Sequence, residues 1–255
     1  PKEWNIKDAY VKDLKGNKII DFKKSNLHIL GYSTPFQGII SHEELMEHIY
    51  TLPEIPEAIP YLTSYYKERW GFCLEHQRLK ELNQDKYEIF IDSELKNGSM
   101  SIGEGFIKGK IDKEVLLSTY LCHPSMGNNE LSGPIVQTLL YNWLLERKDK
   151  LKYSYRFLYL PETIGSITYL SLFGENLKKN VVAGYVINCI GDRGKFTYKK
   201  SRQGNSLADK AALNILNNLN EDFNLYEWFP AGSDERQYCS LGFNLPIGSL
   251  MRSMY

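Results

Sequence analysis

The sequence lacks an excess of charge of either sign, a cluster of cysteines and a long apolar run. Its 31 basic and 31 acidic residues give a formal net charge of +0, so the bulk charge favours neither nucleic acid nor an anionic membrane surface as a partner. No apolar stretch approaches the roughly 20 residues that a membrane-spanning helix needs. We therefore expect a globular protein that works without nucleic acid and without a membrane.

The cysteines are few and widely spaced. They are Cys73, Cys122, Cys189 and Cys239. None of them forms a CxxC pair, which argues against a zinc site made of thiolates and against a dense disulfide framework. We expect free thiols buried in the core and a reducing, cytoplasmic compartment. The short lysine pairs Lys178-Lys179 and Lys199-Lys200 are expected to be solvated surface charge.

The first part of the chain indicates a small β-rich unit. Short strand patterns lie at 9–11, 18–22 and 27–30, and residues 13–17 form a turn signal between the first two. Ser41 and Glu44 form a capping box that opens a helix. Closely spaced prolines then exclude a continuous helix. We expect residues 1–60 to form a β-rich subdomain with a proline-rich linker, inserted in the main domain or packed on it.

Strand and helix patterns alternate through most of the remaining chain. The segment 87–92 alternates as a half-buried strand, and 99–109 looks like its antiparallel partner. Apolar runs that suit strands covered on both faces follow, with helix patterns between them: strands at 115–121, 153–160 and 181–190, and helices at 132–147, 163–173, 206–219 and 233–240. For residues 61–255 this order predicts an α/β domain, a three-layer sandwich with a mostly parallel, mixed central sheet.

Side chains suited to metal binding follow three of these strands. His123 comes after 115–121, Glu162 after 153–160 and Asp192 after 181–190. In such sheets ligands bind at the carboxyl ends of the strands, and zinc takes imidazole nitrogen and carboxylate oxygen. Each residue also has a structural alternative: a core histidine, a carboxylate at a helix N-terminus and a turn former, respectively. Together the strand ends predict a metal site at one edge of the sheet.

Several motifs, in a fixed order, resemble one family. They are Cys122–Ser125, Asn128–Gly133, Pro161–Ser166 and Asp234–Cys239. They resemble a bacterial aminopeptidase-like domain family of unknown function, related to the dinuclear zinc aminopeptidases, with the patterns Cys-His-Pro-Ser, Asn-Asp-Asn-Leu-Ser-Gly, Pro-x-Thr-Ile-Gly-Ser and Asp-Glu-Arg-Gln-Tyr-Cys. The resemblance covers nearly the whole chain and implies a zinc-peptidase-like fold.

The resemblance also implies a reaction: metal-activated water hydrolyses an N-terminal peptide bond or a related amide. The implied cofactor is zinc, as one or two ions, and the implied substrate is a small peptide or an aminoacyl amide. His123 then matches the first histidine ligand, and Glu162 is either a ligand or the catalytic base. The aspartate ligand at a strand end falls at Asn188 or Asp192, of which only Asp192 carries a charge.

The segment around α-helical residues 233–240 carries the implied substrate contacts. By resemblance, Asp234 and Glu235 lie where the family shapes its substrate pocket. Arg236 lies beside them and could bind a substrate carboxylate. A homo-oligomer is compatible with this arrangement.

The sequence departs from the family pattern at two places. Asn129 stands at the position of the aspartate that bridges two zinc ions, and a neutral amide is a poor bridge between cations. Glu130 is next to it and could take its place as a ligand, with a longer side chain that shifts the metal. The family's last histidine lies in a Tyr-His-Thr-Ser segment beyond the Leu-Met-Arg-Ser of residues 250–253, so we expect a C-terminally incomplete aminopeptidase-like domain.

Two alternatives to a metal hydrolase remain open. The first is a catalytically degenerate binding or regulatory module with the aminopeptidase fold and a link to surface polysaccharide biosynthesis. The second is a cysteine hydrolase that uses Cys122 beside His123. Neighbouring residues on a strand point to opposite faces, so we expect these two to be poorly placed as a nucleophile and its base.

Overall fold

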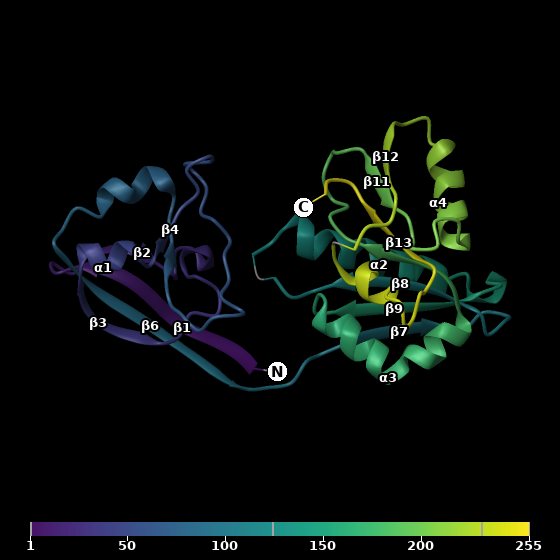
Figure 1. Cartoon of the computed structure of the whole chain (residues 1–255), viewed down its shortest axis with the longest axis horizontal. Coiled ribbons are helices and arrows are strands. Elements are labelled where there is room, and N and C mark those ends of the chain that lie inside the picture. The colour runs from purple at the N-terminus through teal and green to yellow at the C-terminus, as the bar shows by residue number, and fades with distance from the viewer. Residues whose placement is uncertain (1, 124, 231, 255) are drawn as a thin grey trace. The chain divides into compact units, whose positions relative to one another are not determined.

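The computed structural model describes residues 2–123, 125–230 and 232–254. They form two compact units that divide between Ser99 and Met100 (Figure 1). The sequence pattern instead predicts a boundary near residue 60. The difference arises because β6 (Lys86–Asn97) pairs along its length with β1 (Lys2–Asp13), from Lys2 opposite Asn97 to Asp13 opposite Tyr87. A twelve-residue strand paired in this way is part of the first sheet and cannot begin the second unit.

The first unit is built on a four-stranded sheet in the order β2-β1-β6-β3. Its other elements are β2 (Lys18–Asp21), β3 (Phe36–Ser41), α1 (His42–Met46), β4 (Ile49–Tyr50), β5 (Phe72–Cys73), and the 3-10 turns η1 (Asn26–His28) and η2 (His76–Glu81). The predicted cap of α1 is confirmed, since Ser41 Oγ accepts a hydrogen bond from Glu44 N at 3.1 Å. The predicted strand at 27–30 is wrong: Ser25 Oγ accepts from Leu27 N and starts η1 instead.

The expected pairing of residues 99–109 with the strand before them is also wrong. Both edges of β6 are occupied, one by β1 and the other by β3. The later segment forms β7 (Gly103–Ile107), which runs antiparallel to β9 (Ser154–Leu160) in the second unit. Because β6 has no free edge, residues 103–107 pair with a strand of another sheet.

The second unit holds a seven-stranded sheet in the order β12-β11-β13-β10-β8-β9-β7, and Figure 1 shows β8, β9 and β7 following one another across it. The remaining strands are β8 (Glu114–Tyr120), β10 (Val181–Ile187), β11 (Phe196–Lys199), β12 (Phe223–Tyr226) and β13 (Ile247–Met251). The central strands β13, β10, β8 and β9 are parallel, whereas β7 and β11 are antiparallel to their inner neighbours. This confirms the predicted mixed, mostly parallel sheet.

Helices cover both faces of this sheet, and the three-layer prediction is confirmed. They are α2 (Gly133–Leu145), α3 (Ile164–Asn180), α4 (Leu207–Asn217) and α5 (Asp234–Tyr238), with the short turns η3 (Asn128–Ser132) and η4 (Lys148–Lys150). Neighbouring residues of β8 point to opposite faces: Leu116 packs with Leu170 of α3, and Leu117 packs with Leu144 of α2. The strand is apolar on both sides because both sides are covered.

The register of the parallel strands brings their carboxyl ends to one edge. Val186 of β10 lies opposite Ser118 of β8 and opposite Ser249 of β13. The segments after these strands therefore leave the sheet side by side. Gly133 lets α2 begin close against this edge, since a Cβ there would lie 2.3 Å from the backbone oxygen of Ile187.

Among the described residues, no helix is both long enough and apolar enough to cross a membrane.

Candidate metal centre at the edge of the sheet

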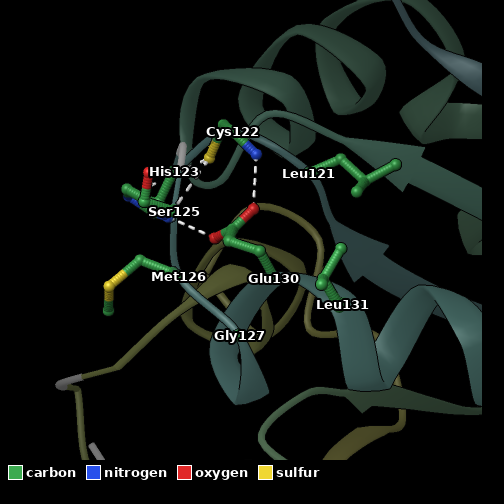
Figure 2. Close-up of a pocket in the computed structure, with 8 residues that line it drawn as sticks. All are labelled: Leu121, Cys122, His123, Ser125, Met126, Gly127, Glu130 and Leu131. Carbon is green, nitrogen blue, oxygen red and sulfur yellow. Dashed lines mark hydrogen bonds and ion pairs between the residues drawn. The ribbon is translucent and has the colours of Figure 1, made fainter. Parts of the chain in front are cut away.

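Three side chains with metal-binding atoms gather where β8 ends. The donor atoms of Cys122, His123 and Glu130 all lie within 4.8 Å of one another. Cys122 and His123 follow β8 directly, and Glu130 belongs to the turn η3 that precedes α2. Figure 2 shows the Glu130 carboxylate between the backbone nitrogen of Cys122 and the ring of His123, with all three facing one pocket.

Glu130 is held in place by hydrogen bonds to the cluster. Its Oε2 accepts from Cys122 N at 2.5 Å, and its Oε1 contacts His123 Nδ1. The residue is only 4% exposed. Burying a carboxylate costs free energy unless it is hydrogen-bonded or paired with a positive charge. Cys122 N and His123 Nδ1 are the groups that stabilise the Glu130 carboxylate here.

Cys122 and His123 lie on the same side of the chain. Cys122 Sγ is 3.6 Å from His123 Nδ1, so the expectation that they point apart is wrong. The reason is that β8 ends at Tyr120, and alternation between faces does not apply to the residues after it. The thiol sulfur also accepts a hydrogen bond from Glu162 N at 3.0 Å, which ties the loop after β9 to the loop after β8.

Glu162 approaches His123 from the other side of the ring. Its Oε2 lies 3.5 Å from His123 Nε2, so the imidazole stands between two carboxylates. The next residue, Thr163, has φ 64°, a conformation that β-branched residues rarely adopt. It is fixed by a hydrogen bond from its backbone nitrogen to Asp234 Oδ1 at 2.8 Å. The ends of β8 and β9 thus bring His123 and Glu162 together, and their role in a metal site stays a prediction.

The surroundings of His123 stabilise its charged form. Contact with Cys122 and then with Glu130 raises the pKa of the imidazole to about 10. In the absence of a cation the ring therefore holds a proton at neutral pH. A metal ion must displace this proton, so metal and proton compete for the same nitrogen.

Asn129 makes contacts that separate it from the cluster. Its Nδ2 donates to Tyr120 Oη at 3.0 Å and to Cys189 Sγ at 3.5 Å. Asn188, the alternative position for the strand-end aspartate, donates to the same Tyr120 oxygen at 3.0 Å. Both amides are therefore oriented by the phenol at the end of β8, and neither belongs to the group formed by Cys122, His123 and Glu130.

Asp192 organises the loop after β10. Its Oδ1 accepts from Gly194 N at 2.6 Å and from Ser253 Oγ at 2.8 Å, and its Oδ2 accepts from Asn128 Nδ2 at 2.6 Å. These bonds, led by that from Gly194, lower the pKa of the carboxyl group. The bond from Gly194 N is the contact of a turn former, and the bonds from Asn128 and Ser253 join this loop to two other segments; a role of Asp192 as a metal ligand stays a prediction.

The three residues predicted to bind substrate have different environments. Asp234 is 0% exposed and accepts from Thr163 N and Ser166 Oγ, and burial raises its pKa to about 7. Glu235 is also buried and forms an ion pair with Lys199 at 2.5 Å. Arg236 is exposed. The burial of Lys199 overturns the expectation that this lysine is solvated surface charge, because its partner lies far along the chain.

Sequence reasoning missed two residues of this region. From the sequence, Cys122 is expected to be a free thiol and is weighed as a nucleophile but not as a metal ligand, although its position directly before His123 at a strand end is a usable signal. For Lys199 no local signal existed. It ends a short strand, and only the fold brings Glu235 to it.

Comparisons with known proteins agree with this architecture. A sequence model of a family described as a domain of unknown function, DUF4910, matches residues 3–255. A relative from Clostridium acetobutylicum, named for polysaccharide biosynthesis and an aminopeptidase-like domain, is 50% identical over 255 residues. A crystal structure from the same organism, named for a peptidase, matches 100% of this chain with a TM-score of 0.94 and 49% identity. The chain spans 58% of the length of that relative and 60% of that crystal structure.

More distant structures share the fold. A zinc aminopeptidase of Bacillus subtilis matches 99% of this chain and 74% of its own with a TM-score of 0.66 at 11% identity. A peptidase M28 precursor of Shewanella amazonensis matches 99% of this chain and 73% of its own with a TM-score of 0.59 at 12% identity. Since the family model covers nearly the whole sequence, the chain belongs to the DUF4910 family, and its fold is that of the zinc aminopeptidases.

Proposed function

We propose that this chain forms the core of a zinc-dependent, aminopeptidase-like hydrolase that cleaves an N-terminal peptide bond or a related amide. The observation that carries the proposal is the group of Cys122, His123 and Glu130, whose donor atoms lie within 4.8 Å of one another. This group stands at the carboxyl edge of parallel strands, where sheets of this kind bind their ligands. The fold shared with zinc aminopeptidases supports the same reaction class.

The donor set fits zinc. Thiolate, imidazole and carboxylate are its usual protein ligands, at about 2.0–2.3 Å. Glu130 is a buried carboxylate beside an imidazole, and a cation in the group would satisfy its charge. Cys122, His123 and Glu130 would hold the ion. Bound zinc would lower the pKa of a water molecule and polarise the carbonyl of the scissile bond.

The surrounding residues would transfer the proton and bind the substrate. Glu162 is partly buried and 3.5 Å from His123, a suitable place for a base that takes a proton from water and delivers it to the leaving amine. The backbone nitrogen of Glu162 donates a hydrogen bond to Cys122 Sγ, and that of the next residue, Thr163, donates to Asp234 Oδ1. These two bonds fix the backbone that carries the Glu162 side chain. Arg236, exposed on α5, would bind the carboxylate of a short peptide.

We further propose a single zinc ion. A second ion would need Asn129 and Asp192 as ligands. Asn129 presents its amide nitrogen to Tyr120, and both oxygens of Asp192 already accept hydrogen bonds, Oδ1 from Gly194 N and Oδ2 from Asn128 Nδ2. The four free cysteines fit a reducing, cytoplasmic compartment.

A second candidate function is a non-catalytic binding module on the same fold. The neutral Asn129 at the bridging position favours it, because hydrolysis by two ions needs an anionic bridge. The name of the Clostridium acetobutylicum relative would connect such a module to polysaccharide biosynthesis. Zinc binding without hydrolysis of any aminoacyl amide would favour this candidate.

The proposal is tested by hydrolysis. The purified protein is stripped with a chelator, reloaded with zinc and assayed on a panel of aminoacyl p-nitroanilides. We expect hydrolysis that needs zinc, and Glu162→Gln should lower it by roughly 10²–10⁴-fold while zinc stays bound. Glu175→Gln, an exposed glutamate on α3, is the matched control and should have no effect. Equal rates with and without zinc would refute the proposal.

A further inference from the structure

A second cavity lies on the same edge of the sheet, beyond β10. The residues that define its chemistry are Lys199, Tyr226, Phe229, Gly232, Glu235 and Met251. They come from β11, β12, the segment after β12, α5 and β13. The cavity is small, about 160 Å³, which is the size of one side chain rather than of a peptide.

The sheet register places this cavity near the metal-binding group. Ser249 of β13, Val186 of β10 and Ser118 of β8 lie in one row across the sheet. Met251 lies two residues after Ser249 in β13, and Tyr120 lies two residues after Ser118 in β8, so both are at the carboxyl ends of their strands. The two are separated by β10 alone, or about 10 Å at the usual strand spacing. One small substrate can therefore span the distance from the end of β8 to the cavity.

A buried ion pair forms one wall of the cavity. Lys199 is 4% exposed and Glu235 1%, and Lys199 Nζ lies 2.5 Å from Glu235 Oε1. The ammonium group also stands over the ring of Phe229, 4.3 Å from its centroid. Glu235 Oε2 has no hydrogen-bond partner among the described residues. A buried acceptor without a partner costs about 1–3 kcal/mol, and a donor that reached this oxygen from the cavity would remove that cost.

The backbone around the pair is shaped to close over it. Gly232 has φ 107°, which side chains rarely tolerate, and a Cβ there would lie 2.5 Å from Glu235 Oε1 and 2.8 Å from Lys199 Nζ. Only glycine allows the chain to pass this close. The pair is thus enclosed by the protein on one side and lines the cavity on the other.

The charges in the wall select the ligand. Lys199 and Glu235 neutralise each other, so a charged group in the cavity would remain an unpaired buried charge. A purely apolar group would leave Glu235 Oε2 without a partner. An uncharged group with an N–H or O–H donor satisfies that oxygen, and its aliphatic part packs against Met251 and Phe229.

We propose that Lys199 and Glu235 determine substrate specificity, and that the cavity takes an uncharged, hydrogen-bonding side chain, a carboxamide or a hydroxyl. This side chain belongs to the aminoacyl residue whose amide bond is cleaved beside Cys122, His123 and Glu130. The inference rests on the proposed function for the identity of the reaction, but binding in the cavity is measured separately from hydrolysis.

The test uses amino-acid amides of similar size with different side chains. Binding of L-glutaminamide, L-methioninamide and L-glutamic acid α-amide is measured by calorimetry on the zinc-loaded Glu162→Gln variant, which should keep zinc but hydrolyse amides slowly. All three carry the same α-ammonium group, so differences report on the side chain. We expect glutaminamide to bind at least tenfold more tightly than the other two. Equal binding of methioninamide, or no binding of any of the three, would overturn the proposal.

Two variants test the role of the pair. Glu235→Gln removes the carboxylate that pairs with Lys199 and should shift the preference towards the glutamic acid amide. The double variant Lys199→Met with Glu235→Leu removes both charges and is expected to fold, because apolar replacement of a buried ion pair is often neutral or stabilising. It should prefer methioninamide at least threefold, and a retained preference for glutaminamide would overturn the assignment. Selective binding without hydrolysis would support the cavity and refute the proposed function.

Discussion

The side-chain nitrogen of Asn129 lies 3.0 Å from the hydroxyl oxygen of Tyr120, to which it donates a hydrogen bond. Asn188 donates to the same oxygen from the end of β10. Tyr120 thereby holds two neutral amides at the edge of the sheet, beside a cluster that contains the buried carboxylate of Glu130. Glu130 and Glu162 thus supply the negative charge around His123, and the neutral amides at positions 129 and 188 add none, which is the basis for a site with one ion.

Asn129→Asp should create a second anionic ligand position. The new carboxylate would accept a hydrogen bond from Tyr120 Oη and still offer an oxygen to a cation. We expect zinc affinity to rise about tenfold, or a second zinc ion to bind, as read by titration with a competing chelator. Asn176→Asp, on the exposed face of α3, is the control. An unchanged affinity and stoichiometry would show that position 129 does not face the ion.

Gly133→Ala should destabilise the second unit. A Cβ at this position would lie 2.3 Å from Ile187 O and 2.4 Å from Thr119 Oγ1, so the start of α2 would have to move away from the sheet. We expect a loss of roughly 1–3 kcal/mol in the free energy of unfolding, measured with urea. Gly127→Ala is the matched control, because nothing lies within 4 Å of its Cβ. Similar stability of the two variants would argue against the tight packing of α2.

Asp234 should make stability fall as pH rises. Burial raises its pKa from 3.8 to about 7, so between about pH 4 and pH 7 the folded state binds a proton that the unfolded state has lost. Stability from this group is complete below pH 4 and is lost through pH 7, by up to about 4 kcal/mol. Asp234→Asn should remove this dependence while keeping the acceptor for Thr163 N and Ser166 Oγ.

Urea unfolding at a series of pH values checks this prediction. Asp222→Asn is the control, since Asp222 is exposed and pairs with Lys195 at the surface. Its pH profile should follow that of the wild type. The same slope in Asp234→Asn would mean that another group causes the pH dependence.

The sequence predicted those features that depend on local pattern and on the geometry of parallel strands. The apolar run at 115–121 is a strand covered on both faces, because Leu116 and Leu117 each have a helix to pack against. His123 and Glu162 meet because β8 and β9 are parallel neighbours and end at the same edge. A titratable residue directly after each of two parallel strands was enough to predict that these side chains lie at the same edge of the sheet.

Features that depend on distant parts of the chain could not be predicted in this way. The alternation at 87–92 identifies a strand but does not reveal that its partners are β1 and β3. The turn after Tyr120 brings Cys122 beside His123, and strand alternation gives the wrong answer there. Lys199 looks like surface charge until the fold places Glu235 against it. Each case needs the tertiary structure because the deciding contact is not local.

The measurement that tests the central claim most directly is zinc binding by the purified protein and three variants, Cys122→Ser, His123→Ala and Glu130→Gln. Zinc is titrated against a competing chelator, with His76→Gln in the first unit as the control histidine. We predict one zinc ion per chain, at least tenfold weaker binding in each of the three variants, and unchanged binding in the control. A protein that binds no zinc, or binds it equally well without His123, would contradict the assignment of this cluster as a metal centre.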